Sequence, residues 1–211
     1  MKISEAMKHK GRPFWIPDCT RSELPAFFKE IGFKRGVEIG VAWAQNIIDY
    51  CEAGLEMYGI DPWHETEDFK YRKIISVEGK YGKTIEGIYQ LAKDRTAKYP
   101  NCKLIAKTSM EALADFKDRS LDFVYIDGDH SFGYVAMDIW KWSRKVRKGG
   151  VIAGHDYHST IGMRSIRQVR QVVDAFINTS EVENWWGVGR PDAKEGEKRD
   201  RELSFFFFKH W

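Results

Sequence analysis

Short apolar runs alternate along the chain with stretches in which apolar residues recur at helical spacing. The apolar runs predict strands over residues 36–40, 55–60, 103–106, 121–126, 150–154 and 203–208. The helical spacing predicts helices over 22–31, 44–53, 83–98 and 164–176, and one between the strands at 121–126 and 150–154. This alternation is typical of an α/β fold with an open, mostly parallel sheet and helices on both faces.

Ionisable residues come directly after two of these predicted strands. They are Asp127, Asp129 and His130 after the strand at 121–126, and His155 and Asp156 after the strand at 150–154. A helical crossover makes two such strands parallel, so their carboxyl ends meet at one edge of the sheet. Ligands bind at this edge in open α/β sheets, and we therefore expect a functional site there.

A turn that contains glycine follows the first predicted strand. Glu38 and Gly40 lie in it, at a place where glycine lets the backbone approach a ligand. Ala42 and Ala44 replace glycines that would suit a pyrophosphate, which favours a ligand without phosphate. Asp61 follows the second strand, about 20 residues later, where an acid can accept hydrogen bonds from ribose hydroxyls. The pattern indicates a nucleoside site, although a tight turn at Gly40 and a turn residue at Asp61 would be structural alternatives.

Charge and cysteine usage narrow the class of protein. A net charge of +3 does not by itself indicate nucleic-acid binding. The three cysteines are scattered and form no CxxC, which suits a reducing cytoplasm rather than a disulfide framework or a zinc site. No apolar run approaches the roughly 18 residues of a membrane span. We expect a cytoplasmic protein that acts on a small molecule, not on nucleic acid or a membrane.

Five segments together resemble the class I S-adenosylmethionine-dependent methyltransferases. The segments are EIGV at 38–41, GIDPW at 59–63, YIDGDHSF at 125–132, RKGGVIAGHDY at 147–157 and GMRSIRQV at 162–169. The most similar group is the small-molecule branch with macrolide and aminocoumarin sugar O-methyltransferases, which itself resembles catechol O-methyltransferase. The resemblance implies a Rossmann-like sheet of seven strands, the last antiparallel and formed by 205–208. It also implies a methyltransferase domain over 36–211, preceded by an N-terminal arm and helix over 1–35.

The resemblance further implies where the cofactor, S-adenosylmethionine, would lie. Glu38, Gly40 and Ala42 would lie beside its methionine part, Asp61 would bind the ribose, and Trp63 would cover the adenine. The remaining implied contacts are Thr108, Ser109 and Met110 beside the adenine, and Asp127 near the amino-acid part. The expected product is an O-methylated small molecule.

Two ways of activating the acceptor hydroxyl follow from the same residues. In metal-dependent relatives a magnesium ion is held at positions that correspond to Asp127, His155 and Asp156. A histidine at 155 would shift the preference from Mg²⁺ toward a softer divalent ion, or mean that no metal binds. His130 or Asp129 would otherwise act as general base. His155 has either a catalytic role or the structural one of ordering its loop.

Other classes of protein share parts of this pattern. An NAD(P)-binding Rossmann-like oxidoreductase would have the glycine turn and Asp61, but it predicts a fuller glycine motif. A non-catalytic nucleoside-binding module would keep the pocket without turnover. The N-terminal arm would serve as a lid, as a contact in a homo-oligomer, or as packing on the sheet edge.

Overall fold

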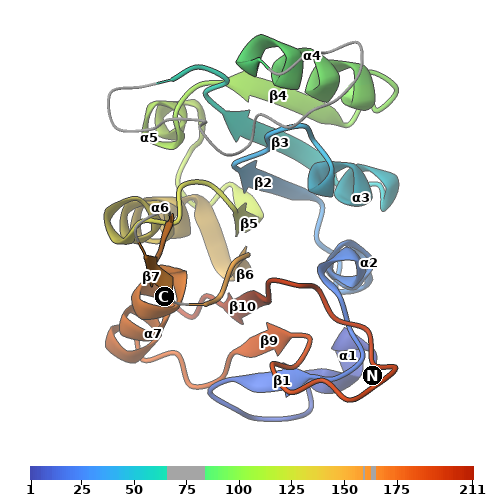
Figure 1. The fold of residues 1–211 in the computed structure, drawn as a ribbon, viewed down its shortest axis with the longest axis vertical. Coiled ribbons are helices and arrows are strands. Elements are labelled where there is room, and N and C mark those ends of the chain that lie inside the picture. Colours follow the sequence, from blue (N-terminus) through green and yellow to red (C-terminus); the bar gives the residue numbers. More distant parts are fainter. Residues whose placement is uncertain (66–83, 159, 163–164) are drawn as a thin grey trace.

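An eight-stranded sheet forms the centre of the protein (Figure 1). The computed structural model describes residues 1–65, 84–158, 160–162 and 165–211. The strand order is β1-β9-β10-β6-β5-β2-β3-β4. The strands of this sheet are β1 (Phe14–Ile16), β2 (Arg35–Ile39), β3 (Glu56–Asp61), β4 (Cys102–Ala106), β5 (Leu121–Ile126), β6 (Val146–Gly154), β9 (Trp186–Val188) and β10 (Ser204–Phe208).

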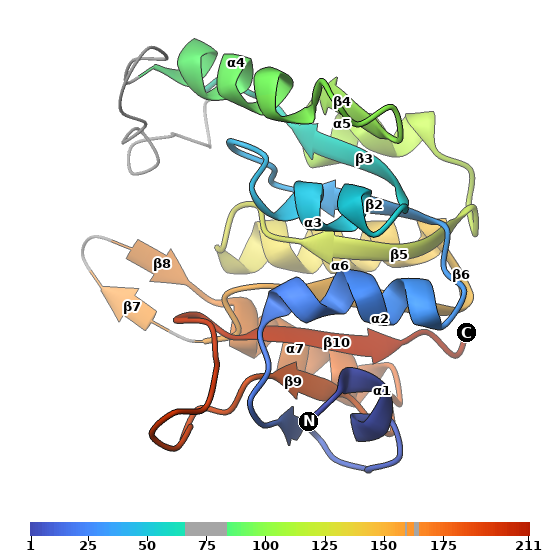
Figure 2. The same cartoon turned by 90° about the vertical axis from the view of Figure 1, so that its right-hand side faces the viewer.

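Helices cover both faces of the sheet (Figure 2). One face carries α1 (Ile3–Ala6), α2 (Leu24–Glu30), α3 (Asn46–Glu52) and α4 (Ile85–Thr96). The other face carries α5 (Ser109–Ala112), α6 (Phe132–Lys145) and α7 (Val169–Thr179). Short 3₁₀ turns, η1 (Arg21–Glu23) and η2 (Leu113–Asp115), precede α2 and follow α5, and β7 (Thr160–Gly162) pairs with β8 (Ser165–Arg167). The predicted α/β class with helices on both faces is confirmed.

Alternation along the strands divides the core between the two faces. In β5, Phe123 and Tyr125 pack with α2 and α3, whereas Val124 and Ile126 pack with α6 and α7. Successive side chains of a strand point to opposite faces, so a strand covered on both sides must be apolar throughout. This explains why the central strands appear in the sequence as continuous apolar runs.

The predicted count of seven strands is wrong, because the sheet has eight. β10 is antiparallel to β6, as expected for the last strand, but it does not end the sheet. It also pairs with β9, and β9 pairs in parallel with β1 from the N-terminal arm. β1 and β9 have three residues each, too few to give a periodic signal in the sequence. Of the roles considered for the arm, packing on the sheet edge is the one observed.

Two predicted helices begin later than expected. Residues 165–167 form β8, so the helix predicted from 164 begins as α7 at Val169 and continues to Thr179. The helix predicted from 44 begins as α3 at Asn46. The helix predicted over 83–98 is α4, where the Thr84 side chain accepts a hydrogen bond from the Gly87 N–H at 3.0 Å. Residues 83 and 164 lie outside the described part of the chain.

The register of the parallel strands sets the position of the site. Ile39 of β2 pairs with Ile60 of β3 and with Ile126 of β5, and Ile126 pairs with Gly154 of β6. These four strands therefore end at one level. The residues that come next, including Gly40, Asp61, Asp127 and His155, emerge at the same edge of the sheet. None of the helices in the described ranges is long and apolar enough to cross a membrane.

Candidate functional site

Gly40 brings the end of β2 against the loop that follows β5. Its φ is +84°, and a Cβ atom at this position would lie 2.1 Å from the carbonyl oxygen of Asp127. The Gly40 N–H donates to the Ile60 carbonyl at 2.8 Å, and the Asp127 N–H donates to the Ile39 carbonyl at 2.8 Å. Both the left-handed conformation and the close approach require glycine here.

The alanines after Gly40 adopt backbone conformations that glycine would favour. Ala42 has a φ of +46° and Ala44 a φ of +59°, which costs roughly 1–2 kcal/mol each for a residue with a Cβ atom. Asp61 holds the turn in place, because Oδ2 accepts from the Ala42 N–H at 2.9 Å and Oδ1 accepts from the Trp63 N–H at 3.0 Å. The glycine-type turn is thus kept without two of its glycines.

Trp63 lies inside the protein beside this turn. Only 5% of it is exposed, its Nε1–H donates to the Ala42 carbonyl at 2.9 Å, and its ring stacks on Tyr89 of α4 with centroids 4.4 Å apart. One face of the indole is therefore covered by a protein ring. A ligand base would have the other face or an edge of Trp63 to contact.

Glu38 is a buried acid with an open acceptor atom. The residue is 1% exposed, and Oε1 accepts from Asn46 Nδ2 at 3.0 Å. Within the described part of the chain, Oε2 has no hydrogen-bond partner. Burial raises the pKa of Glu38 to about 8, against the opposing effect of the Asn46 hydrogen bond. A buried acceptor of this kind is costly unless a ligand supplies a donor.

The residues predicted after β4 lie at the start of α5. The Thr108 hydroxyl accepts from the Glu111 N–H at 3.3 Å and so caps this helix. Ser109 accepts from Trp142 Nε1–H at 2.9 Å and donates to Asp138, an acid that is 4% exposed. Met110 packs against the core on the same face. The Ser109 hydroxyl is therefore already engaged with side chains of α6.

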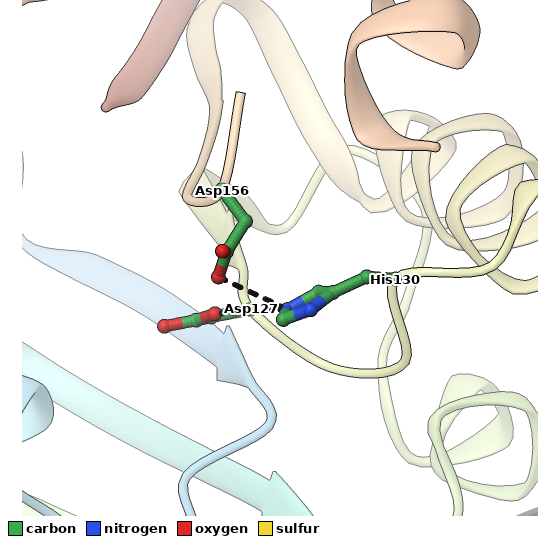
Figure 3. Close-up of side chains that lie close together, drawn as sticks. All are labelled: Asp127, His130 and Asp156. Atoms are coloured by element: carbon green, nitrogen blue, oxygen red, sulfur yellow. Dashed lines mark hydrogen bonds and ion pairs between the residues drawn. The ribbon is translucent and has the colours of Figure 1, made fainter. Parts of the chain in front are cut away.

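Asp127, His130, His155 and Asp156 form a histidine–aspartate cluster, part of which Figure 3 shows. His130 Nε2 lies 3.4 Å from Asp127 Oδ1 and 3.3 Å from Asp156 Oδ2. His155 Nδ1 lies 3.1 Å from Asp156 Oδ2 and 3.7 Å from Asp127 Oδ1. The structure thus brings together all three residues predicted to bind metal, and adds His130 to them.

Opposite charges within the cluster shift the pKa values of its members. Burial alone would raise the pKa of Asp127, but hydrogen bonds with His130 and His155 hold it below its ordinary value. The pKa of Asp156 lies far below its ordinary value for a similar reason, with His155 as the main partner. Burial opposes the charge on His155, yet Asp127 and Asp156 raise its pKa to about 9. Without a metal, His155 is therefore an imidazolium at neutral pH.

The contacts of His130 in the cluster are longer than those of three direct ion pairs elsewhere in the described part of the chain. Charge-assisted hydrogen bonds are about 2.7–2.9 Å long, and the Arg35–Glu56, Lys107–Asp115 and Arg147–Asp122 pairs have 2.8, 2.7 and 2.7 Å. The contacts of His130 are 3.3 and 3.4 Å. Neighbouring ligands around an ion with bonds of about 2.1 Å are roughly 3.0–3.4 Å apart. One nitrogen and two carboxylate oxygens, from His130, Asp127 and Asp156, thus fit a shared cation.

Asp156 also belongs to a second group of potential ligands. Its Oδ1 lies 3.1 Å from His158 Nε2, which lies 3.2 Å from Glu202 Oε2. Asp156 itself has a left-handed φ of +54°, so the backbone is constrained where the carboxylate is placed. No pattern in the sequence indicates His158 or Glu202 as a ligand, and Glu202 is remote from Asp156 along the chain.

Asp129 is oriented by its own loop. Its Oδ1 accepts from the Ser131 N–H at 2.8 Å, just before α6 begins. Gln168 clamps the same loop, because its N–H donates to the His130 carbonyl at 2.8 Å and its Oε1 accepts from the Phe132 N–H at 3.0 Å. Asp129 therefore acts as a local turn residue in this arrangement, beside the cluster.

Arg21 is a site residue that the sequence did not reveal. It comes from the turn η1, and its Nη1 lies 3.4 Å from Asp127 Oδ2 with 24% of the side chain exposed. The Arg21 N–H donates to Asp200 Oδ2 at 2.7 Å. Burial would lower the pKa of Arg21, but Tyr125 and Asp127 raise it, so the guanidinium stays charged. The sequence predicts a helix from residue 22 here, but no local signal points toward β5.

A family model and a known relative both match this chain. A family model described as "Methyltransferase domain" matches residues 30–157. Uncharacterized protein y4gI of Sinorhizobium fredii (strain NBRC 101917 / NGR234) is 28% identical over 130 residues, which are 58% of this chain and 13% of that protein. The chain thus spans only a small part of that relative.

Solved structures share the fold. A putative caffeoyl-CoA O-methyltransferase from Staphylococcus aureus superposes with a TM-score of 0.58 at 15% identity, over 89% of this chain and 82% of that one. The O-methyltransferase from Bacillus cereus in complex with SAH superposes with a TM-score of 0.57 at 14% identity, over 90% and 80% of the two chains. At such identities the likeness extends to the fold and not to the substrate.

Proposed function

The chain belongs to the methyltransferase-domain family, and from this premise we propose that it is an S-adenosylmethionine-dependent O-methyltransferase acting on a small molecule. One observation carries the proposal. Asp127 touches the glycine turn through its backbone and the histidine–aspartate cluster through its carboxylate. A pocket for an activated methyl group and a set of groups that can activate a hydroxyl would therefore adjoin each other.

The residues of the turn fit the cofactor. Asp61 follows the end of β3 beside the Gly40 turn, where its carboxylate would bind the ribose hydroxyls. Glu38 offers its buried Oε2 to a donor. Gly40 and Ala42 would lie along the methionine part, while Trp63, Thr108, Ser109 and Met110 would border the adenine. The structure of the Bacillus cereus O-methyltransferase, a complex with SAH, supports this assignment.

The histidine–aspartate cluster would activate the acceptor hydroxyl. When bound, S-adenosylmethionine supplies a methyl group on a positively charged sulfur, so the protein must orient the hydroxyl and take up its proton. His155 already carries a proton at neutral pH, because Asp127 and Asp156 raise its pKa to about 9. His130 is 25% exposed at its side chain and is therefore the better base, with Asp129 beside it as the other candidate. Asp127 and Asp156 would stabilise the imidazolium that His130 becomes.

A divalent ion is the second way to activate the hydroxyl. Asp127, His155 and Asp156 would hold it, and a site at this place is supported by the ligand atoms of Asp127, His130 and Asp156, which lie within 4.8 Å of one another. Such an ion would lower the pKa of a bound hydroxyl, and mixed nitrogen and oxygen ligands suit Mn²⁺ or Zn²⁺ as well as Mg²⁺. His155 would then have to lose its proton before binding the ion.

We further propose a cytoplasmic location and a division into an arm and helix over 1–35 and a cofactor-binding domain over 36–211. The free cysteines Cys19, Cys51 and Cys102 support a reducing compartment. Two contacts join these parts: Arg21 pairs with Asp127, and β1 pairs with β9. Separate expression of 36–211 would therefore lose Arg21 from the site and expose β9 as an edge.

Ligand-induced thermal stabilisation separates the proposed function from the two alternatives. S-adenosylmethionine and S-adenosylhomocysteine should raise the melting temperature, and Asp61→Ala should remove most of this effect by losing charged hydrogen bonds worth about 1.5–3 kcal/mol. Stabilisation by NAD or NADP instead would indicate an oxidoreductase. Binding of the methyl donor without transfer to any hydroxyl acceptor would indicate a nucleoside-binding module.

A further inference from the structure

The ligand proposed above ends in an amino acid, and this end carries two opposite charges. Its ammonium and carboxylate groups are attached to the same carbon atom. Removing either charge from water is costly unless the protein supplies an opposite charge or hydrogen-bond partners. A site that binds this end in a sheltered place therefore needs both an acceptor for the ammonium and a donor for the carboxylate.

Glu38 supplies the acceptor. Its Oε2 is buried, and among the described residues it has no hydrogen-bond partner. Glu38 is the last residue but one of β2, two residues before Gly40, and the charges of Asp127 and Arg21 act on it. This atom indicates that a donor from a ligand completes the site.

Arg21 supplies the donor on the other side of Asp127. Its partner in the cluster is Asp127 Oδ2, which lies 3.4 Å from Nη1, a single long contact. A guanidinium has five N–H donors in a planar fork that matches a carboxylate. Contacts with Asp127 and Tyr125 use only part of this capacity.

Arg21 is also held firmly enough to act as a fixed donor. Its N–H donates to Asp200 Oδ2 at 2.7 Å. Just before it, the Cys19 N–H donates to the Lys198 carbonyl at 3.1 Å, and Asp18 Oδ1 accepts from the Lys198 N–H at 2.9 Å. The segment before α2 and the loop before β10 are thus joined by hydrogen bonds next to Arg21.

We propose that Arg21 binds the carboxylate of the amino-acid end of the methyl donor while Glu38 binds its ammonium group. This inference rests on the proposed function and adds the N-terminal segment to the cofactor site. It gives Arg21 a role that merely holding Asp127 in place would not require.

Two ligands that differ only at this end test the proposal. S-adenosylhomocysteine has the amino-acid end, and 5′-methylthioadenosine has the same adenosine thioether without it. Their dissociation constants would be measured by calorimetry for the full chain and for Arg21→Gln, Arg21→Lys and Glu38→Gln. Arg12→Gln is the matched control, because Arg12 is exposed in the same arm and donates to Asn178. Melting curves without ligand would check that each variant folds.

We expect Arg21→Gln to weaken S-adenosylhomocysteine binding by roughly 10- to 100-fold and to leave 5′-methylthioadenosine within about twofold. For Arg21→Lys, the affinity for S-adenosylhomocysteine should lie between those of the unmodified protein and Arg21→Gln, since lysine keeps the charge but lacks the planar fork of donors. Glu38→Gln should show the same ligand selectivity, and Arg12→Gln should change neither affinity.

Equal weakening of both ligands by Arg21→Gln would overturn the inference and reduce Arg21 to a residue that holds Asp127. Unchanged binding of both would also overturn it. If Arg21→Gln fails to fold, the same comparison in Arg21→Lys decides. Absence of binding of either ligand to the unmodified protein would instead contradict the proposed function.

Discussion

The two halves of the site are built in different ways. Around Gly40 and Asp61, contacts run through backbone groups, whereas Glu38 accepts from the Asn46 side chain, and the two acids are 1% and 4% exposed. In the histidine–aspartate cluster, contacts run between ionisable side chains, and Asp127 and His130 are 20% and 25% exposed. The first half is held by backbone hydrogen bonds at Gly40 and Asp61, with Glu38 as its titratable group. The second depends on which protons or ions are present, so ligands and pH should act on the two halves differently.

The largest expected effect comes from breaking the cluster. If His130 is the base, EDTA is harmless and His130→Ala lowers methyl transfer by roughly 10²- to 10⁴-fold, which is what general-base catalysis supplies. If a metal activates the hydroxyl, EDTA abolishes transfer, Mn²⁺ or Mg²⁺ restores it, and Asp156→Asn behaves like the chelated enzyme. Transfer rates with and without chelator measure this. A protein indifferent to both EDTA and His130→Ala would contradict both mechanisms.

The next largest effect is expected from a substitution in the glycine turn. Gly40→Ala places a Cβ atom 2.1 Å from the Asp127 carbonyl at a φ of +84°, so we expect a loss of about 2–4 kcal/mol in the free energy of unfolding. Gly32→Ala is the matched control, because Gly32 has a φ of +83° and nothing within 4 Å of its added Cβ atom. The control should lose only about 1 kcal/mol. Equal losses in urea unfolding would show that the approach to Asp127 is unimportant.

A smaller effect should appear in the pH dependence of stability. The pKa of Glu38 is about 8 in the folded protein and ordinary, near 4.5, when unfolded. Its contribution is therefore fully present below pH 4.5 and is lost as pH rises toward 8, on the order of a few kcal/mol. Glu38→Gln should flatten this decline, and Glu30→Gln, at an exposed position, should not. Parallel stability curves for Glu38→Gln and the unmodified protein would argue against a protonated, buried Glu38.

The difference between the halves also explains what the sequence could predict. The strand at 121–126 was predicted with its observed bounds, because a buried parallel strand is a continuous apolar run. The meeting of Asp127, His155 and Asp156 followed from the order of strands alone. In contrast, β1 and β9 are too short to be recognised, and the sheet gained an eighth strand through them.

Contacts between segments that are distant along the chain could not be predicted from the sequence, because they depend on how the elements pack. Arg21 contacts Asp127 and Glu202 contacts His158 from opposite ends of the chain, and neither stands in a local pattern that indicates its partner. Trp63 is expected beside the adenine by resemblance, but its stacking on Tyr89 depends on how α4 packs. Spacing along the chain predicts which strand ends carry polar groups. It does not predict which side chains complete the site from outside the sheet.

A crystal structure of the complex with S-adenosylhomocysteine tests the central claim most directly, because it shows whether the two halves form one site around Asp127. We predict that the ribose hydroxyls bind Asp61, that the amino-acid end lies between Glu38 and Arg21, and that the sulfur faces His130 and Asp156. A ligand whose sulfur faces away from the histidine–aspartate cluster, or a ligand bound outside the Gly40 turn, would contradict the account.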